Sequence, residues 1–349
     1  MDTTCPYQIR LNSPKGERTE RLPNAIGIGT HKSGTGALSF LDCHPELTIR
    51  ILEANAYTYE DKLYFECGQY TLPKTTPYEF LIEKSPLYAE RFSRSSKLDK
   101  RELRLQELDD LKSGSYETVK RARQMIKTNP SVKLFMFITD PVGRAYSQIT
   151  QILRPDMKRL RARLREYETA SEVIKAATDY VARIGNTEAL ADAFQTELEE
   201  DNIQVGWYLR ILLQIGNYYS TIIDYEQVFG KGSVFLVDGH NEIINPNDEF
   251  TRLLTFFDVD PTLIDFQFNA EKGFYCLEKP LRFCLSEEKG HRNSSFNLFD
   301  VYPEMNTLKR GYAAQMTKLY RHIYNCHSTE ECCKINETRF NWLKPYFCE

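Results

Sequence analysis

Three short apolar runs, each ending beside a glycine or an aspartate, constrain the fold of this chain more than any other feature. The runs are AIGIG at 25–29, VKLFMFIT at 132–139 and VFLV at 234–237. Short runs made mostly of apolar residues indicate strands buried on both faces of a sheet. Longer stretches with helical periodicity lie between and after them, at 115–127, 154–198, 203–229 and 303–325. This alternation predicts an α/β fold, a doubly wound parallel sheet with helices on both faces.

The carboxyl ends of these strands predict where a ligand binds, because ligands of open parallel sheets gather at that edge. The three strands end at Gly29, Thr139 and Asp238. The first end leads into GTHKSGTG at 29–36 and then into an apolar helical pattern. Such a glycine-rich turn exposes backbone N–H groups that suit a phosphate or a sulfate. Lys32 comes two residues before Gly34, so the turn differs from the Gly-Lys-Ser/Thr loop of enzymes that bind nucleoside triphosphates.

The length of 349 residues allows one large domain with a full hydrophobic core. Residues 1–21 are polar and contain prolines and a glycine, which predicts an N-terminal arm or linker before a domain at 22–349. Within that domain, about 154–200 is predicted to be a helical insertion that begins basic and ends acidic. Two interpretations of the insertion remain open, a solvated helical face or a wall that attracts a polyanion.

Charge and hydropathy argue against two classes of partner. The chain has 45 Lys and Arg against 49 Asp and Glu, a net charge of −4, whereas nucleic-acid-binding domains are usually basic. A local cluster of cations can still bind an anionic ligand. No apolar stretch approaches the roughly 18 residues of a membrane-spanning helix. The N-terminal MDTTCPYQIR also lacks the apolar core of a signal peptide, so we expect the sequence as given to be soluble, without signal or anchor.

The cysteines and two glycosylation motifs indicate an oxidising compartment. Six of the nine cysteines lie in the last quarter of the chain, and N-x-S/T motifs occur at Asn293 and Asn336. These features predict a protein of the secretory pathway. No CxxC pair occurs, which argues against a zinc ribbon. The odd number means that at least one cysteine is unpaired within the chain.

Five segments, in this order along the chain, together resemble one enzyme family. They are KSGT at 32–35, IEKSP at 82–86, DPVGRAYS at 140–147, KGFYC at 272–276 and, after Cys284, KGHR at 289–292. The chain resembles the Golgi heparan sulfate glucosamine sulfotransferases, which use 3′-phosphoadenylyl sulfate (PAPS). The resemblance covers about 22–342 apart from the insertion and is closest to the glucosaminyl 3-O-sulfotransferases. The N-sulfotransferase domain of the N-deacetylase/N-sulfotransferases is a near second. The fold it implies is a sheet of the P-loop nucleotide-kinase and sulfotransferase type.

The resemblance implies a binding site for PAPS as co-substrate. Lys32 and the loop to Gly36 would hold the 5′-phosphosulfate, and Lys32 would stabilise charge that grows on the leaving phosphate oxygen. Arg144 and Ser147 lie three residues apart, so both could point from one helix face at the 3′-phosphate. The complete set of implied donor-binding residues is Lys32, Ser33, Gly34, Thr35, Gly36, Thr139, Arg144, Ser147, Phe274, Tyr275, Lys289, Gly290, His291, Arg292 and Asn293.

The resemblance also implies an adenine wall made of Phe274 and Tyr275. A disulfide between Cys276 and Cys284 matches the family and would hold this wall rigid. Four further cysteines have no family counterpart, and a second bridge among them could follow any pairing. They are Cys326, Cys332, Cys333 and Cys348.

Transfer to a sugar hydroxyl requires a base. The family's catalytic glutamate lies shortly after a His-Pro pair, and the count from His44-Pro45 leads to Glu53. Lys84 matches a family lysine beside the transferred group, where it could bind the sulfonate or the acceptor. The reaction that the resemblance implies requires no metal, because lysines and N–H dipoles supply the positive charge. The implied acceptor is heparan sulfate, and the implied compartment is the Golgi lumen.

Two departures from the family put the specificity in doubt. Thr139 stands where the 3-O branch has an arginine, and Asn55 stands where it has a histidine two residues beyond the catalytic glutamate. The primary hypothesis is sulfation of the glucosamine 3-hydroxyl, and the alternative reaction is N-sulfation. A hypothesis of a different class is a catalytically silent relative that binds sulfated glycan.

Overall fold

The chain divides into two compact units, which we describe separately. The first comprises Met1–Tyr88, Arg123–Ile138 and Phe229–Ser295, and the second comprises Ala89–Ala122, Thr139–Val228 and Phe296–Glu349. The structure, a computed structural model, describes residues 19–50, 74–76, 79–90, 116–154, 167–199, 207–285, 298–337 and 339–348.

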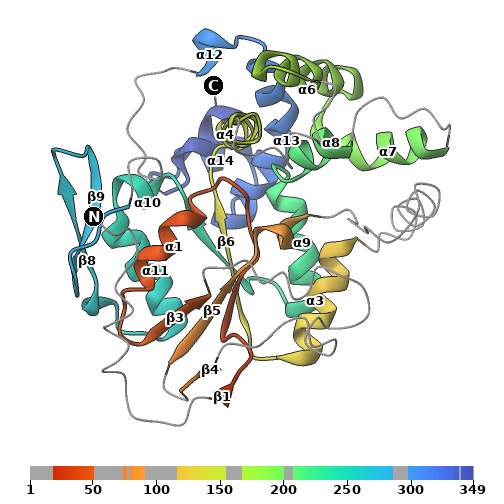
Figure 1. Cartoon of the computed structure of the whole chain (residues 1–349). Helices are drawn as coiled ribbons and strands as arrows, with labels where there is room; N and C mark the ends of the chain where they lie inside the picture. The colour runs from red at the N-terminus through yellow and green to blue at the C-terminus, as the bar shows by residue number, and fades with distance from the viewer. Residues whose placement is uncertain are drawn as a thin grey trace. The chain divides into compact units, whose positions relative to one another are not determined.

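A parallel five-stranded sheet flanked by helices forms the centre of the first unit (Figure 1). Its strands are β2 (Ala25–Gly27), β3 (Leu47–Arg50), β5 (Phe80–Lys84), β6 (Lys133–Ile138) and β7 (Val234–Asp238). Their order across the sheet is β3-β5-β2-β6-β7, so β2 lies in the middle. The predicted α/β class with a parallel sheet is confirmed.

The register at the carboxyl end of β2 determines what surrounds the loop that follows it. Gly27 is aligned with Lys84 on β5 and with Phe135 on β6. A Cβ atom on Gly27 would lie 2.8 Å from the ring of Phe135, so this position requires a glycine. Beyond β2, the N–H groups of Ile28 and Thr30 donate to carbonyls of β6 at 2.9 and 3.1 Å. The chain therefore stays paired with β6 until the loop begins.

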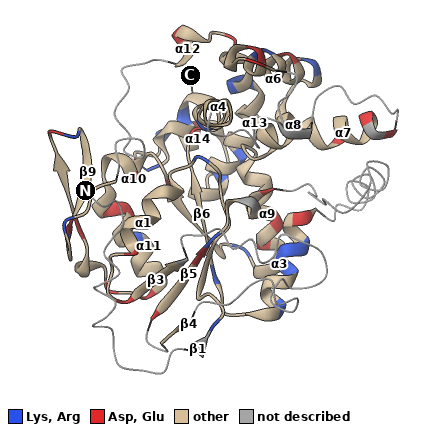
Figure 2. Ribbon diagram, viewed as in Figure 1, with Lys and Arg blue, Asp and Glu red and all other residues tan. Residues whose placement is uncertain are grey.

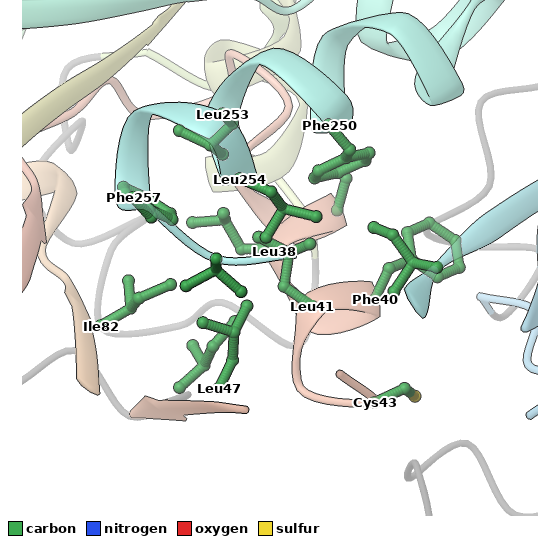
Figure 3. Packing of buried hydrophobic residues seen from close by; sticks show 14 of the residues in the cluster. Leu38, Phe40, Leu41, Cys43, Leu47, Ile82, Phe250, Leu253, Leu254 and Phe257 are labelled. Carbon is green, nitrogen blue, oxygen red and sulfur yellow. The ribbon is translucent and has the colours of Figure 1, made fainter. Parts of the chain in front are cut away.

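Two helices cover one face of the sheet with apolar side chains. They are α1 (Leu38–Leu41), preceded by the 3-10 turn η2 (Thr35–Ala37), and α11 (Pro246–Phe257). Figure 3 shows Leu38 and Leu41 of α1 lying against Leu254 of α11. Full burial of one such side chain stabilises a fold by about 1.5–3 kcal/mol. This packing holds the start of α1, and with it the end of the preceding loop, against the sheet.

Smaller elements complete the first unit. The hairpin of β8 (Asp265–Asn269) and β9 (Phe274–Lys279) is antiparallel, and the short strands β1 (Thr19–Glu20) and β4 (Lys74–Thr75) pair with each other. The turn η3 (Pro86–Ala89) follows β5, α10 (Asn241–Ile244) follows β7, and η6 (Pro261–Leu263) precedes β8. Helix α3 (Glu117–Thr128) crosses the boundary between the two units.

The second unit is helical in the residues that the structure describes, and α13 (Met305–Tyr324) contacts several of its other elements. These elements include α4 (Pro141–Ile152), α6 (Ala170–Ile184), η5 (Thr187–Ala189), α14 (Thr329–Lys334) and η7 (Asn341–Tyr346). The remaining ones are α7 (Leu190–Glu199), α8 (Trp207–Gln214), α9 (Tyr218–Phe229) and α12 (Leu298–Val301). Figure 2 shows acidic residues on α7, which agrees with the acidic end predicted for the stretch at 154–200.

The three apolar runs form strands as predicted, but two long helical predictions are wrong in detail. The stretch at 203–229 contains α8 and α9, separated at Ile215–Asn217. Gly216 lies against the ring of Tyr312, and the side-chain amide of Asn217 donates to the carbonyl of Thr187 at 2.7 Å. The stretch at 154–198 is interrupted at Gly185, whose φ of 86° ends α6. Tertiary contacts at Gly216 and Asn217, and the left-handed conformation of Gly185, thus end helices that the periodicity of the sequence predicted to continue.

Three disulfides connect cysteines of the described residues. Cys276 pairs with Cys284, with the two Cα atoms 4.6 Å apart, as the family resemblance implies. The connectivity that the sequence left open is Cys326–Cys332 and Cys333–Cys348. Asn336, one of the two predicted glycosylation sites, is exposed. Among the described helices, none combines the length and the apolar character needed to cross a membrane.

We predict that Gly216→Ala destabilises the protein. A Cβ at this position would lie 2.7 Å from three atoms of the Tyr312 side chain, whose hydroxyl donates to the carbonyl of Leu213 at 2.8 Å. Overpacking of this kind costs about 1–3 kcal/mol. The measurement is chemical or thermal unfolding followed by circular dichroism. Gly143→Ala in α4 is the control, because its nearest contact of 3.5 Å is an ordinary one. Equal stability of the two variants would contradict the packing described here.

Candidate functional site

The loop from Gly29 to Gly34 leaves the middle strand at the carboxyl edge of the sheet. Its buried part is tied down by Thr30 and Ser33, whose hydroxyl groups are hydrogen-bonded to each other. The Thr30 hydroxyl also donates to the carbonyl of Phe137 on β6 at 3.2 Å. These bonds fix the two ends of the turn and leave Lys32 exposed between them.

The backbone of this loop turns through left-handed conformations at two positions. Lys32 has a φ of 66° and Gly34 a φ of 93°. Non-glycine residues seldom adopt positive φ, and such residues cluster at functional sites. Gly34 precedes η2, and no side chain caps it. Successive N–H groups in a turn that changes hand can form a concave anion-binding surface. Binding of a phosphate or sulfate by this loop stays a prediction.

Gly239, immediately after β7, forms the support beneath the loop. A Cβ atom on Gly239 would lie 2.4 Å from the carbonyl oxygen of Ser33. The N–H of Gly239 donates to the carbonyl of Ile138 at 2.8 Å, which continues the pairing of β6 and β7. Sequence analysis did not identify Gly239, although a glycine directly after the third predicted strand is a signal for close backbone approach.

The end of β5 places Lys84 beside the origin of the loop. Lys84 is half-buried and is aligned with Gly27, two residues before the loop begins. The N–H of Ser85 donates to the carbonyl of Gly27 at 3.0 Å. The buried carboxylate of Glu83 accepts hydrogen bonds from the hydroxyls of Ser85 and Tyr88 at 2.9 and 2.6 Å. This network fixes the backbone on both sides of Lys84.

The two predicted adenine-wall residues lie on β9. Phe274 is buried beneath the ammonium group of Lys272, which lies 5.9 Å from its ring centroid. The rings of Tyr275 and Phe268 pack in a T-shaped arrangement, with their centroids 5.4 Å apart. Tyr275 also packs against the apolar core. Neighbouring residues of a strand point to opposite faces, so the two rings do not form one continuous surface. The Cys276–Cys284 disulfide joins β9, next to these two residues, to the segment that follows it.

In the second unit, the segment after β6 begins with Thr139 and a strongly capped helix. The carboxyl group of Asp140 accepts from the N–H of Gly143 and from the hydroxyl of Tyr346, both at 2.7 Å. Burial raises the pKa of the Asp140 carboxyl above its ordinary value. Ser147, seven residues after Asp140 on α4, is half-buried.

Arg144 lies differently from the expectation that it points with Ser147 at one phosphate. Its side chain is 1% exposed. The guanidinium group donates to the carbonyl of Leu212 at 2.6 Å and to the amide oxygen of Gln148 at 2.5 Å. The carbonyl of Leu212 lies near the end of α8, where backbone acceptors lack helical partners. Arg144 therefore joins α4 to α8, and its spacing from Ser147 did not determine the direction of its side chain.

Other predicted site residues lie outside the described residues. They are the base Glu53 and the segment Lys289, Gly290, His291, Arg292 and Asn293. In the described part of the chain, no group of three or more His, Cys, Asp or Glu side chains has the arrangement of a metal site.

Comparisons with known proteins identify the relatives of this chain. No protein-family model matches it. Human heparan sulfate glucosamine 3-O-sulfotransferase 5 is 26% identical over 290 residues, which cover 81% of this chain and 67% of that protein. Mouse heparan sulfate glucosamine 3-O-sulfotransferase 3B1 is 24% identical over 286 residues, covering 79% and 57%. The chain is homologous to the heparan sulfate glucosamine sulfotransferases. The family resemblance predicted from five short motifs is thereby confirmed.

Two further comparisons add to this relationship. Human bifunctional heparan sulfate N-deacetylase/N-sulfotransferase 2 is 24% identical over 349 residues, covering 95% of this chain and 32% of that protein. The matches to these sulfotransferases thus span between about a third and two thirds of the relatives' own length. The crystal structure of a sulfotransferase from Alicyclobacillus acidocaldarius superposes with a TM-score of 0.52 at 14% identity, covering 89% of this chain and 98% of that one. This likeness shows that the chain has a sulfotransferase fold.

We predict that Lys32→Ala weakens binding of 3′,5′-adenosine bisphosphate, the product that PAPS leaves behind. The variant removes the exposed cation of the loop, and hydrogen bonds to charged groups contribute about 1.5–3 kcal/mol, or roughly 10-fold to 100-fold in affinity. Isothermal titration calorimetry measures the change. Lys231→Ala is the control, because this exposed lysine precedes β7 at the opposite end of the strand. Unchanged affinity in Lys32→Ala would remove the loop from the donor site.

Proposed function

We propose that this protein transfers a sulfonate group from PAPS to glucosamine residues of heparan sulfate, at the 3-hydroxyl. The observation that carries the proposal is the loop at 29–34, which follows the middle strand and contains two left-handed residues. The strand's last residue, Gly27, is aligned with Lys84. Homology to heparan sulfate glucosamine sulfotransferases supports the reaction and the acceptor. We further propose that residues 22–349 act as one sulfotransferase domain.

The proposed donor site combines the loop with residues of the other segments. Lys32 and the loop to Gly36 bind the 5′-phosphosulfate, and Ser147 binds the 3′-phosphate. The segment Lys289–Asn293 also binds the 3′-phosphate, as the family resemblance implies. Thr139 precedes the cap of α4 and contributes a hydroxyl in place of the guanidinium found in the 3-O branch. Arg144 supports α4 through Leu212 and Gln148, which leaves phosphate binding to its neighbours.

The proposed chemistry is a direct displacement at sulfur. The acceptor hydroxyl oxygen forms a bond to sulfur while the bond from sulfur to the phosphate oxygen breaks. Glu53 takes the hydroxyl proton, and 3′,5′-adenosine bisphosphate leaves. Lys32 stabilises the negative charge that accumulates on the leaving oxygen. Lys84, fixed by the network around Glu83, stabilises the transferred sulfonate or orients the acceptor. In this scheme lysines and backbone N–H groups supply the positive charge, and no metal takes part.

A second candidate reaction is N-sulfation of glucosamine. One observation favours it: the similarity to the human N-deacetylase/N-sulfotransferase extends over 95% of this chain. For either reaction, we propose the Golgi lumen as the compartment. The three disulfides and the exposed Asn336 are consistent with that compartment.

We predict that the protein releases 3′,5′-adenosine bisphosphate from PAPS when a heparan sulfate oligosaccharide is present. The assay uses oligosaccharides of defined sulfation, followed by disaccharide analysis of the product. New 3-O-sulfate supports the primary proposal, and new N-sulfate supports the second. Glycan binding without any donor turnover would instead identify a catalytically silent relative and overturn the proposed reaction.

We predict that Glu53→Gln lowers turnover by at least about 100-fold, because general-base catalysis contributes roughly 10²–10⁴-fold. The substitution keeps the shape of the side chain but removes its basic group. Affinity for 3′,5′-adenosine bisphosphate should stay near the wild-type value, since other residues bind the donor. Glu60→Gln is the matched control and should retain activity. Full activity in Glu53→Gln with loss in Glu60→Gln would move the base to Glu60.

A further inference from the structure

Glu242 is a buried acid that the proposed reaction does not use. It lies on α10, four residues after the end of β7, and is 6% exposed. Its Oε2 atom is buried and has no hydrogen-bond partner among the residues that the structure describes. Burying a polar group without a partner is costly, so such an atom requires an explanation.

The unpartnered oxygen lies directly against the anion-binding loop. A Cβ atom on Gly34 would lie 3.1 Å from Oε2 of Glu242. Gly34 is one of the two left-handed residues of the loop. The adjacent carbonyl of Ser33 rests on Gly239, three residues before Glu242. The carboxyl group of Glu242 and the backbone of Gly239 thus support the same part of the loop from below.

The surroundings of Glu242 favour its neutral form. Burial and the charge of Glu249 raise the pKa of the Glu242 carboxyl to about 8. Glu249 itself accepts hydrogen bonds from the N–H of Asp238 and the side-chain amide of Asn241, at 2.9 and 3.0 Å. The elements around Glu242 carry the following titratable and charged residues: His240 on its own segment, Asp238 at the end of β7, Asp248, Glu249 and Arg252 on α11, Tyr275, Glu278 and Lys279 on β9, and His31 and Lys32 in the loop.

We propose that Glu242 is a positioning residue of the donor site, which supports the loop at Gly34 as a neutral acid and opposes donor binding as a carboxylate. The inference rests on the proposed function, because it needs an anion in this loop. A neutral carboxyl group adds no charge beneath the bound phosphosulfate. A carboxylate at the same place, shielded from water, repels that anion.

The direction of the pH effect follows from linkage. A bound anion favours the protonated form of Glu242, so donor binding takes up a proton at pH values above about 8. Affinity for the donor should therefore fall as the pH rises through 8. In the free protein, the folded state binds the proton more tightly than the unfolded state. The contribution of Glu242 to stability is greatest below its ordinary pKa of 4.5 and declines as the pH rises toward 8.

The experiment measures the affinity for 3′,5′-adenosine bisphosphate at about pH 7 and about pH 9 in wild type and in Glu242→Gln. The glutamine keeps the size of the side chain but cannot ionise. Between the two pH values, the wild-type dissociation constant should rise by about fivefold to tenfold more than that of the variant, which corresponds to a ligand-induced shift of about one pKa unit. Glu242→Leu, which is also neutral, should match Glu242→Gln in its pH profile.

Glu278→Gln is the matched control. This glutamate lies on β9, an element that contacts α10, and its carboxylate faces Arg282 at 3.6 Å. It should retain the wild-type pH profile. Binding with the same pH profile in wild type and in both Glu242 variants would overturn the role of Glu242 but leave the proposed function standing. Absence of bisphosphate binding to wild type at every pH would overturn the proposed function itself, and this inference with it.

Discussion

Close approach of the loop to the carboxyl edge of the sheet is the constraint on which the rest of the site depends. The carbonyl of Ser33 lies where a side chain on Gly239 would be, and the backbone of Gly34 lies against Glu242. Protein interiors are close-packed, so a single added methyl group at such a contact must displace the chain. The hydroxyl of Thr30 ties the loop to Phe137 from the other side. These contacts thus hold the turn that presents Lys32, a residue type that seldom adopts positive φ.

The parallel sheet brings distant segments of the chain to this edge. Strand β2 lies between β5 and β6, and Lys84 at the end of β5 is aligned with Gly27 of β2. Gly239, directly after β7, lies beneath the loop that follows β2. The register thus determines which residues lie side by side at this edge, and it places Lys84 next to the end of β2 in a chain whose net charge is negative. The same edge also collects acidic groups, and the protonation state of each one affects an anion bound nearby.

The sequence predicted the elements whose signal is local and continuous. The runs at 25–29, 132–139 and 234–237 are mostly apolar and form strands, and the loop after the first was identified from its glycines and lysine. Strands β3 and β5 were not predicted, because LTIR and FLIEK contain polar residues that the sheet edge and the Glu83 network accommodate. The inward direction of Arg144 depends on Leu212, which lies 68 residues away. Contacts of that range leave no periodic pattern in the sequence.

Two buried glutamates at the same edge of the sheet illustrate how hydrogen bonding determines the role of an acid. Glu83 accepts hydrogen bonds from two hydroxyl groups. Oε2 of Glu242 receives none among the described residues, and the nearby Glu249 adds repulsion. The first arrangement fixes the backbone around Lys84. The second suits a neutral group that fills space beneath Gly34, where a negative charge would oppose the anion that we propose the loop binds.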